Sequence, residues 1–499
     1  MVHKNFIYKA NHYKWLFLLL GCLVFLVACT QMNNSTASRA QPVIDLQDCK
    51  LSAPGSTLRL DARCGQLEVF ENREANSGRK IALNIAVIPA ISRNPTPDPL
   101  FFIPGGPGEA ATESYLIVYA AFNRLNQKRD IVLVDQRGTG GSHALRCSME
   151  DEQDEAGEDS TEAMVSACVN SLDADLRFYT TQIAMQDLDQ VREALGYPQI
   201  NLYGASYGTR AALEYLRQFP QNVRTVILDG VAPPNWLLGP STSADGQRAI
   251  QAIFERCQQE TACSQAFPNL VDEFAALLAQ IDQSPVDVQL DHPLTGEPTT
   301  YTLDRDTFTN AIHLLSYTPE TAILLPLLIH STYAEQDFRR FAAQALSTFT
   351  NLEQSISNGM RFSVLCSEDV PFYPENSDAQ GYLGDFVFTA FQDICSYWPV
   401  EPVSPAFHEA VQSDIAVLLL SGEADPVTPP SNAELAAQTL SNSQHWVVPG
   451  MGHINIYRGC IPNLATDFIE KGGFEGIDAT CVQNIAPMPI FVNFNGPLP

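Results

Sequence analysis

Residues 200–210 read Ile-Asn-Leu-Tyr-Gly-Ala-Ser-Tyr-Gly-Thr-Arg, an apolar run that leads into a Gly-x-Ser-x-Gly motif. The run is typical of a buried strand, and residues 210–219 after it have the apolar face of a helix. A serine on such a turn needs small residues two positions away on each side, because strand and helix pass close together. The first amides of the helix then face the group that the serine attacks. The pattern predicts that Ser206 is a nucleophile; the alternative is an ordinary tight turn.

Short apolar runs of the kind found in strands buried on both faces of a sheet recur along the chain, at residues 100–103, 130–134, 225–228 and 415–420. Residues 81–89 and 445–448 predict two further strands. Residues 183–195 have helical apolar spacing and end at Gly196. Strands that alternate with helices predict an α/β protein with a mostly parallel, doubly wound central sheet. Short alternating patches within residues 49–84 are consistent with antiparallel edge strands.

The pattern changes between residues 229 and 415, where several helix-like segments follow one another. We interpret residues 236–407 as a large, mainly helical cap inserted over the carboxyl edge of the sheet, where ligands bind in open α/β folds. The core then consists of two parts, residues 46–235 and residues 408–499.

A serine hydroxyl needs a base to take its proton and an acid to orient that base. Asp425 lies in the loop after the predicted strand at 415–420, and His453 follows the last predicted strand in a Pro-Gly-Met-Gly-His segment. The order Ser206, Asp425, His453 is that of the triad in α/β hydrolases. We therefore predict an α/β-hydrolase fold in which these three residues form the catalytic triad.

Other residues compete for the two supporting roles. Asp229, at the end of a predicted strand, and Glu423 are the alternative acids. Two further histidines are expected to have other roles: His445, inside a strand, is expected to be structural, and His143 is expected to lie in a loop. The alternative for His453 itself is a surface histidine.

The tetrahedral intermediate of acyl transfer also needs amide donors. Residues 104–108, Pro-Gly-Gly-Pro-Gly, follow the predicted strand at 100–103, and the glycines allow the backbone to approach a substrate closely. We predict that the amides of Gly106 and Tyr207 form the oxyanion hole. The alternative is a Gly/Pro turn without a catalytic role.

Five motifs together carry a family resemblance: Gly-Gly-Pro-Gly at 105–108, Asp-Gln-Arg-Gly-Thr-Gly-Gly-Ser at 135–142, Gly-x-Ser-x-Gly at 204–208, Gly-Glu-Ala-Asp-Pro-Val-Thr-Pro at 422–429 and Gly-Met-Gly-His at 450–453. The set resembles the proline iminopeptidase family, and most closely its tripeptidyl aminopeptidase-like branch, over about residues 80–235 and 360–481. The chain differs from iminopeptidases in having Pro104 where they usually have histidine.

This resemblance implies the same triad, with Gly106 in the oxyanion loop, and implies that Asp135 and Arg137 brace their loop by internal hydrogen bonds. An aminopeptidase must also hold the α-ammonium group of its substrate, for which a carboxylate is suited. The candidate is Glu368, in a Cys-Ser-Glu-Asp segment similar to a cysteine-acid motif of the tripeptidyl branch. The alternatives are Glu109 and a Glu368 that only faces solvent.

The first residues have the features of an export signal. Three lysines precede an uncharged apolar run at residues 15–28, which is shorter than the roughly 20 residues that span a bilayer. The run ends in Leu-Val-Ala-Cys, which resembles a bacterial lipobox. We predict a lipoprotein signal peptide at residues 1–28, lipidation of Cys29 and a flexible tether at residues 29–45. The alternative is a plain secretory signal.

Cysteine usage and charge support this interpretation. An even number of cysteines remains after the leader, as expected of disulfides in an exported chain, although sequence alone leaves their connectivity open. Pairing between neighbours is the simplest pattern: Cys49–Cys64, Cys147–Cys168, Cys257–Cys263, Cys366–Cys395 and Cys460–Cys481. Asp and Glu number 57 against 29 Lys and Arg, which argues against a nucleic-acid partner. We expect no metal and no cofactor.

These features predict an exported serine hydrolase, anchored to a membrane by lipid alone, that cleaves peptides from the N-terminus. A carboxylesterase or lipase-like hydrolase with the same triad is the alternative, and an inactive binding lipoprotein is a third hypothesis. Carboxylates lining the pocket favour the peptidase, and an entirely apolar pocket favours the esterase.

Overall fold

The computed structural model describes residues 44–53, 56–147, 149, 160–377 and 379–497. The predicted signal peptide, Cys29 and the predicted tether lie outside these residues, apart from positions 44 and 45. In the described part of the chain no single helix is long and apolar enough to cross a membrane; the helices Arg305–Leu315 and Pro319–Glu335, bent by 119°, meet those limits only as a pair.

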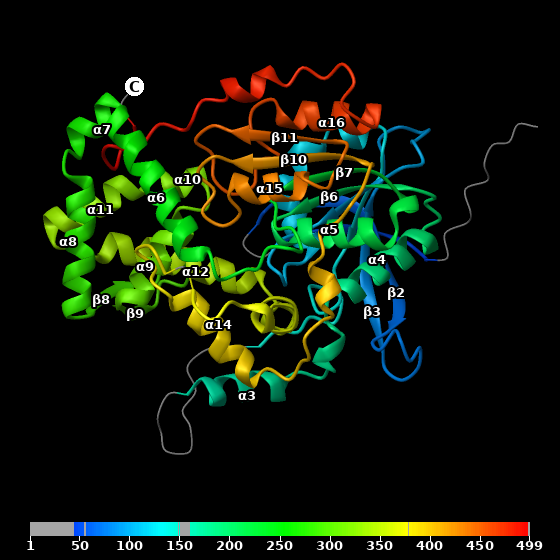
Figure 1. Cartoon of the computed structure of the whole chain (residues 1–499), viewed down its shortest axis with the longest axis horizontal. Coiled ribbons are helices and arrows are strands. Elements are labelled where there is room, and N and C mark those ends of the chain that lie inside the picture. The colour runs from blue at the N-terminus through cyan, green and yellow to red at the C-terminus, as the bar shows by residue number, and fades with distance from the viewer. Residues whose placement is uncertain (1–43, 54–55, 148, 150–159, 378, 498–499) are drawn as a thin grey trace, which may run out of the picture. The chain divides into compact units, whose positions relative to one another are not determined.

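A nine-stranded sheet has the order β1-β2-β3-β5-β4-β6-β7-β10-β11 (Figure 1). Strands β5, β4, β6, β7, β10 and β11 are parallel, whereas β1, β2 and β3 are antiparallel to their neighbours. The strands are β1 (Gln47–Leu51), β2 (Leu60–Phe70), β3 (Lys80–Ile88), β4 (Leu100–Ile103), β5 (Ile131–Val134), β6 (Ile200–Ala205), β7 (Val223–Asp229), β10 (Ala416–Gly422) and β11 (Ser443–Val448). The mostly parallel sheet with antiparallel edge strands is as predicted.

Helices cover both faces of the sheet, which explains why its central strands are apolar throughout. One face packs on α3 (Thr161–Ser171), α4 (Thr181–Ala194), α5 (Tyr207–Gln218) and α15 (Pro430–Ala437). The other packs on α2 (Ala111–Val118) and α16 (Ile461–Lys471). Figure 1 shows α16 above the sheet and α4 and α5 below it.

Between β7 and β10 the chain forms the insertion, which has a hydrophobic core of its own. It contains α6 (Thr242–Gln259), α7 (Thr261–Ala266), α8 (Leu270–Gln283), α9 (Arg305–Leu315), α10 (Pro319–Ala322), α11 (Leu325–Glu335), α12 (Arg339–Ser355), α13 (Asn358–Val364) and α14 (Phe386–Tyr397), and the hairpin of β8 (Val286–Asp291) and β9 (Pro298–Leu303). The helical character agrees with the sequence, which did not indicate the hairpin or α14. Helices α13 and α14 share the hydrophobic core of the α4 and α5 face. The boundaries of the cap stay a prediction.

Two groups of covalent and ionic contacts brace this fold. The five disulfides join the neighbouring cysteines that the sequence analysis paired. Arg137 is fully buried and donates to both carboxylate oxygens of Asp187 and to the Glu71 carbonyl. Asp135 accepts from the amides of Thr112 and Gly141. Both residues therefore brace their loop, as the family resemblance implied.

Candidate active site

Ser206 lies on a sharp turn between β6 and α5. Its backbone has φ 55° and ψ −123°, a conformation that a residue with a side chain rarely adopts and that is often found at functional sites. Two hydrogen bonds hold the turn: the Ser206 amide donates to the Asp229 carbonyl (2.8 Å), and the Thr209 amide donates to the Ser206 carbonyl (2.9 Å). A Cβ at Gly204 would overlap the Gly208 carbonyl oxygen, so the motif requires glycine there.

Asp425 and His453 are brought together by the loops that follow β10 and β11. Asp425 is fully buried, and its Oδ2 accepts from His453 Nδ1 at 2.8 Å. Its Oδ1 accepts from the amides of Val427 (2.8 Å) and Thr428 (2.9 Å). The carboxylate is thus held in one orientation and directs the imidazole, which lines the same cavity as Ser206.

The electrostatics of this pair favour a charged aspartate. Burial raises the pKa of Asp425, but His453 and the two loop amides outweigh it, and the pKa is lowered. Burial lowers the pKa of His453, but the Asp425 carboxylate outweighs it, with smaller contributions from Asp229 and Glu109, and the pKa is raised. The aspartate therefore stabilises an imidazolium, as a base that accepts a serine proton requires.

Sequence reasoning missed Thr428. Its hydroxyl donates to Asp425 Oδ2 at 2.9 Å and lies 3.1 Å from His453 Nδ1. The spacing Asp-Pro-Val-Thr was the available signal, because an aspartate at the start of a tight turn accepts hydrogen bonds from residues two and three positions later. Thr428 thus links the acid to the histidine.

The alternative acids are occupied elsewhere. Asp229 accepts from the amides of Asn455 and Ile456 and from the Tyr203 hydroxyl. Burial raises the pKa of Asp229 to about 6, although these hydrogen bonds act in the opposite direction. The Glu423 carboxylate accepts from the Gly450 amide. Asp229 therefore holds the segment after His453, and neither acid hydrogen-bonds to the imidazole.

The alternative bases are also engaged at a distance from the nucleophile's turn. His445 contacts the Ser421 hydroxyl at 3.0 Å from within β11. His143 contacts the Asp173 carbonyl at 2.9 Å from a loop. Neither lines the cavity of Ser206.

The two predicted oxyanion donors flank Ser206. Gly106 has φ 105°, which favours glycine, and Tyr207 is the first residue of α5. Within the described residues neither backbone N–H has a hydrogen-bond partner. Both residues line a small pocket of about 40 Å³ that also contains Ser206. Two free amides beside the serine are suited to a developing oxyanion.

Ser206 and His453 open into a cavity of about 490 Å³ between the sheet and the insertion. Its wall is mainly apolar, with Phe349, Leu352, Phe386, Phe391 and Ile394 contributed by the insertion. Its charged lining residues are Glu109, Glu353 and Arg361, besides His453. In the described part of the chain no group of His, Cys, Asp and Glu side chains could hold a metal ion.

Glu109 is an acid of the cavity wall that lies close to the turn of Ser206. The place that a Cβ on Gly105 would take is 3.1 Å from Ser206 Cβ and 3.6 Å from Glu109 Oε1. Glu109 Oε2 accepts from the Ser114 hydroxyl at 2.9 Å. Burial raises the pKa of Glu109, and hydrogen bonds from Ser114 and the Gly105 amide act in the opposite direction.

Glu368 does not line this cavity, which corrects the expectation that it meets the substrate. Its side chain is fully buried, and its two oxygens accept from the amide (2.6 Å) and the hydroxyl (2.8 Å) of Thr181. Burial raises the pKa of Glu368 to about 7. The carboxylate is therefore used within the fold. The sequence could not separate it from Glu109, because both follow family motifs.

Comparison with known proteins agrees with this geometry. Residues 98–286 match the family described as alpha/beta hydrolase fold, and residues 380–481 match the family described as TAP-like protein. The chain has the α/β-hydrolase fold. Serine protease Hip1 of Mycobacterium tuberculosis is 27% identical, over 93% of this chain and 96% of its own length. The tripeptidyl aminopeptidase of Streptomyces coelicolor is 24% identical, over 91% and 89%.

A proline iminopeptidase of Neisseria gonorrhoeae is 29% identical, over 31% of this chain and 37% of its own length. The resemblance predicted from the motifs is thus confirmed, and the protein is a serine hydrolase of the aminopeptidase-like α/β hydrolases. The individual roles of Ser206, Asp425 and His453 stay a prediction.

Proposed function

We propose that this hydrolase is a serine aminopeptidase that releases short fragments from the N-terminus of peptides. His453 takes the proton of Ser206, whose oxygen attacks the peptide carbonyl. The Gly106 and Tyr207 amides stabilise the oxyanion. His453 then gives the proton to the departing amine, and water hydrolyses the acyl-enzyme with His453 again as base. Asp425 orients the imidazole throughout.

Glu109 is the observation that carries the peptidase assignment. A carboxylate in a mainly apolar cavity, beside the serine and the oxyanion loop, is suited to an α-ammonium group. An ammonium group that binds there would also favour the ionised carboxylate, against the burial that raises the pKa of Glu109. The hydrogen bond from Ser114 fixes the side chain for this role.

The position of Glu109 also suggests the length of the fragment. Its Oε1 and Ser206 Cβ both lie within 3.6 Å of one point, the place of a Cβ on Gly105. They are therefore separated by no more than two extended residues, about 7 Å. An ammonium group at Glu109 then places the cut after the first or second residue. Glu353, on α12, is the cavity acid that a longer fragment would use.

The test compares chromogenic aminoacyl, dipeptidyl and tripeptidyl substrates, each with a free and an acetylated N-terminus. A charge-assisted hydrogen bond contributes about 1.5–3 kcal/mol, so Glu109→Gln should lower kcat/KM for free N-termini by about 10- to 150-fold. Acetylated substrates should lose much less. Glu113→Gln is the matched control, because Glu113 lies one turn further along and does not line the cavity. An equal loss on free and acetylated substrates would exclude ammonium binding at Glu109.

An esterase is the second candidate, and the apolar wall of the cavity favours it, because acyl chains bind to such surfaces. The same panel includes short-acyl nitrophenyl esters, with Ser206→Ala as the inactive control. Turnover of esters alone would replace the peptidase by this candidate. Turnover of both, with the greater kcat/KM for peptides, would support the peptidase.

We also propose that the protein is exported and anchored through lipid on Cys29. The five disulfides support export, because such bonds persist in oxidising compartments. Metabolic labelling with a fatty acid should mark the native chain and not Cys29→Ala; equal labelling of both would refute the anchor.

A further inference from the structure

Arg361 is a cation in the active-site cavity that the proposed reaction does not use. It lies on α13, is half-buried and lines the same cavity as Ser206 and His453. Within the described residues it forms no ion pair and its side chain donates no hydrogen bond, although the chain has 57 acidic residues. A guanidinium has five donors and stays charged at neutral pH, so these donors are available to an anion in the cavity.

The guanidinium is held between aromatic rings. It lies 5.6 Å from the centroid of Phe362 and 5.8 Å from that of Phe391, which is on α14. Cation–π contacts of this kind use the faces of the guanidinium and leave its N–H edges open. The stack therefore orients Arg361 without giving it a hydrogen-bond partner.

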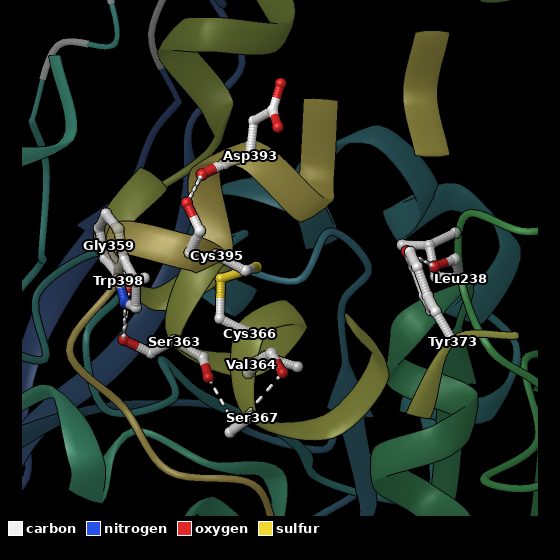
Figure 2. The surroundings of a disulfide bond; sticks show 11 residues. Leu238, Gly359, Ser363, Val364, Cys366, Ser367, Tyr373, Asp393, Cys395 and Trp398 are labelled. Atoms are coloured by element: carbon white, nitrogen blue, oxygen red, sulfur yellow. Dashed lines mark hydrogen bonds between the residues drawn. A yellow bond between two sulfur atoms is a disulfide. The ribbon is translucent and has the colours of Figure 1, made fainter. Parts of the chain in front are cut away.

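A disulfide fixes the two helices that build this stack. Cys366 lies in the π-helical turn Leu365–Asp369 that continues α13, and it is joined to Cys395 of α14, as Figure 2 shows. The same view shows the hydrogen bond from Trp398 Nε1 to the Ser363 hydroxyl, which is 3.2 Å long. The ring centroids of Trp398 and Phe362 lie 5.5 Å apart. Arg361 is thus preorganised by its surroundings, as a recognition residue requires and an incidental surface arginine does not.

Tyr317 connects Arg361 with the catalytic histidine. Its carbonyl accepts from the His453 amide at 2.6 Å, and its ring lies 5.9 Å from the imidazole. Its hydroxyl has no hydrogen-bond partner among the described residues and belongs to a side chain that lines the cavity. Burial raises the pKa of Tyr317 to about 12 and the Arg361 cation acts in the opposite direction, so the phenol remains a donor at neutral pH.

The position of Arg361 and Tyr317 in the cavity decides which part of the substrate they contact. His453 must pass its proton to the departing amine, so the leaving fragment lies beside the imidazole. Glu109 lies next to the oxyanion loop, where the acyl fragment is expected to bind. Tyr317 packs against His453, and Arg361 interacts with Tyr317. The two donors therefore face the leaving fragment.

We propose that Arg361, together with Tyr317, binds a carboxylate of the leaving fragment and makes the enzyme selective for peptides that carry one there. The proposal rests on the peptidase function above. Two groups share this chemistry: the C-terminal carboxylate of a short peptide and an acidic side chain just after the cut. A planar guanidinium binds either one with two parallel hydrogen bonds.

The experiment measures kcat/KM for two matched pairs of peptides. In the first pair a single residue follows the cut, and its C-terminus is either a free acid or an amide. In the second pair the peptide is longer and amidated, and the residue just after the cut is either Glu or Gln. Wild type should prefer the acidic member of one pair by about 10- to 100-fold, and the responding pair identifies the source of the carboxylate. Arg361→Gln should bring that ratio to within about threefold of one.

Two further variants keep the test decisive. Arg340→Gln is the matched control, because Arg340 also stacks on an aromatic ring, that of Phe494, but is exposed and paired with Glu335. It should keep the wild-type ratio. Arg361→Lys, which retains the charge without the fork, should keep part of the preference and serves if Arg361→Gln does not fold. A wild-type ratio near one for both pairs overturns the proposal, as does an unchanged ratio in Arg361→Gln.

Binding separates this proposal from the peptidase function. Calorimetry on Ser206→Ala with the same peptides needs no turnover. If Ser206→Ala binds the acidic member of a pair more tightly than its partner, and the double variant with Arg361→Gln does not, the carboxylate site is supported. This holds even if wild type cleaves only esters. Peptide cleavage without any acid preference, in kcat/KM or in Kd, leaves the peptidase standing and refutes the role of Arg361.

Discussion

Replacing Thr428 by valine tests how the structure orients Asp425, the predicted acid of the triad. Valine has nearly the same shape as threonine but has no hydroxyl, so the change removes the 2.9 Å hydrogen bond to Asp425 Oδ2 and the 3.1 Å contact with His453 Nδ1. Asp425 Oδ1 keeps the hydrogen bonds from its two loop amides, and Oδ2 keeps the one from His453 Nδ1. The carboxylate therefore loses one of four hydrogen bonds and stays buried.

The expected loss follows from that one bond. A hydrogen bond to a charged group contributes about 1.5–3 kcal/mol, which corresponds to about 10- to 150-fold in rate if the whole amount stabilises the transition state. We expect kcat to fall within that range and KM to change by less than about threefold, because the oxyanion amides and the cavity wall are untouched. Thr428→Ser keeps the hydroxyl and should stay within about threefold of wild type.

The assay is steady-state kinetics on the best chromogenic substrate of the panel, with unfolding in denaturant as a check that both variants are folded. A kcat of Thr428→Val within about threefold of wild type would refute the idea that the hydroxyl orients the pair. An equal loss in Thr428→Ser would refute it as well, because the bulk of the side chain would then be the cause.

The remaining predictions concern the histidine and the nucleophile's turn. Plots of kcat/KM against pH should fall on the acid side with a midpoint above about 6.5, because the Asp425 carboxylate outweighs burial and raises the pKa of His453, which must be neutral to act as base. Asp425→Asn should move that midpoint to lower pH; an unmoved midpoint would show that another group sets it. Gly204→Ala should lower the free energy of unfolding by about 1–3 kcal/mol and impair turnover, because the new Cβ overlaps the Gly208 carbonyl. Gly473→Ala, which meets nothing within 4 Å, should change neither quantity, and equal stability of the two variants would contradict this reasoning.

The arrangement of charge in the cavity suggests how one site distinguishes the ends of a peptide. Glu109 lies beside the oxyanion loop, whereas Arg361 is linked through Tyr317 to the side of the histidine. A carboxylate and a guanidinium in one cavity can match the two charged ends of a short peptide. The apolar wall between them would then select the side chains. Together, the Glu109 and Arg361 experiments test this two-ended recognition.

Local pattern was sufficient for much of the fold. Continuous apolar runs indicate strands covered on both faces, and the motif at residues 204–208 requires a close crossing of strand and helix; β4, β5, β6, β7, β10 and β11 lie where these patterns predicted. The hairpin β8–β9 was missed because its strands are short and lie among helices; half of its residues are exposed, in alternation with buried or partly buried ones. Pairing of neighbouring cysteines was also predictable, because short loops bring such residues together.

The sequence by itself determined the architecture, the place of the predicted nucleophile and the short set of candidates for each role, because these depend on local periodicity and on the order of strands along one sheet edge. Only the tertiary structure decided among those candidates. Asp229 and Asp425 both follow strands at that edge, and which one meets His453 depends on which loop amides occupy their oxygens. Glu368 and Glu109 differ in burial. Among the described residues Arg361 has no acidic partner. Only the tertiary structure shows this, because ion pairs depend on distances between side chains and not on their separation in the sequence.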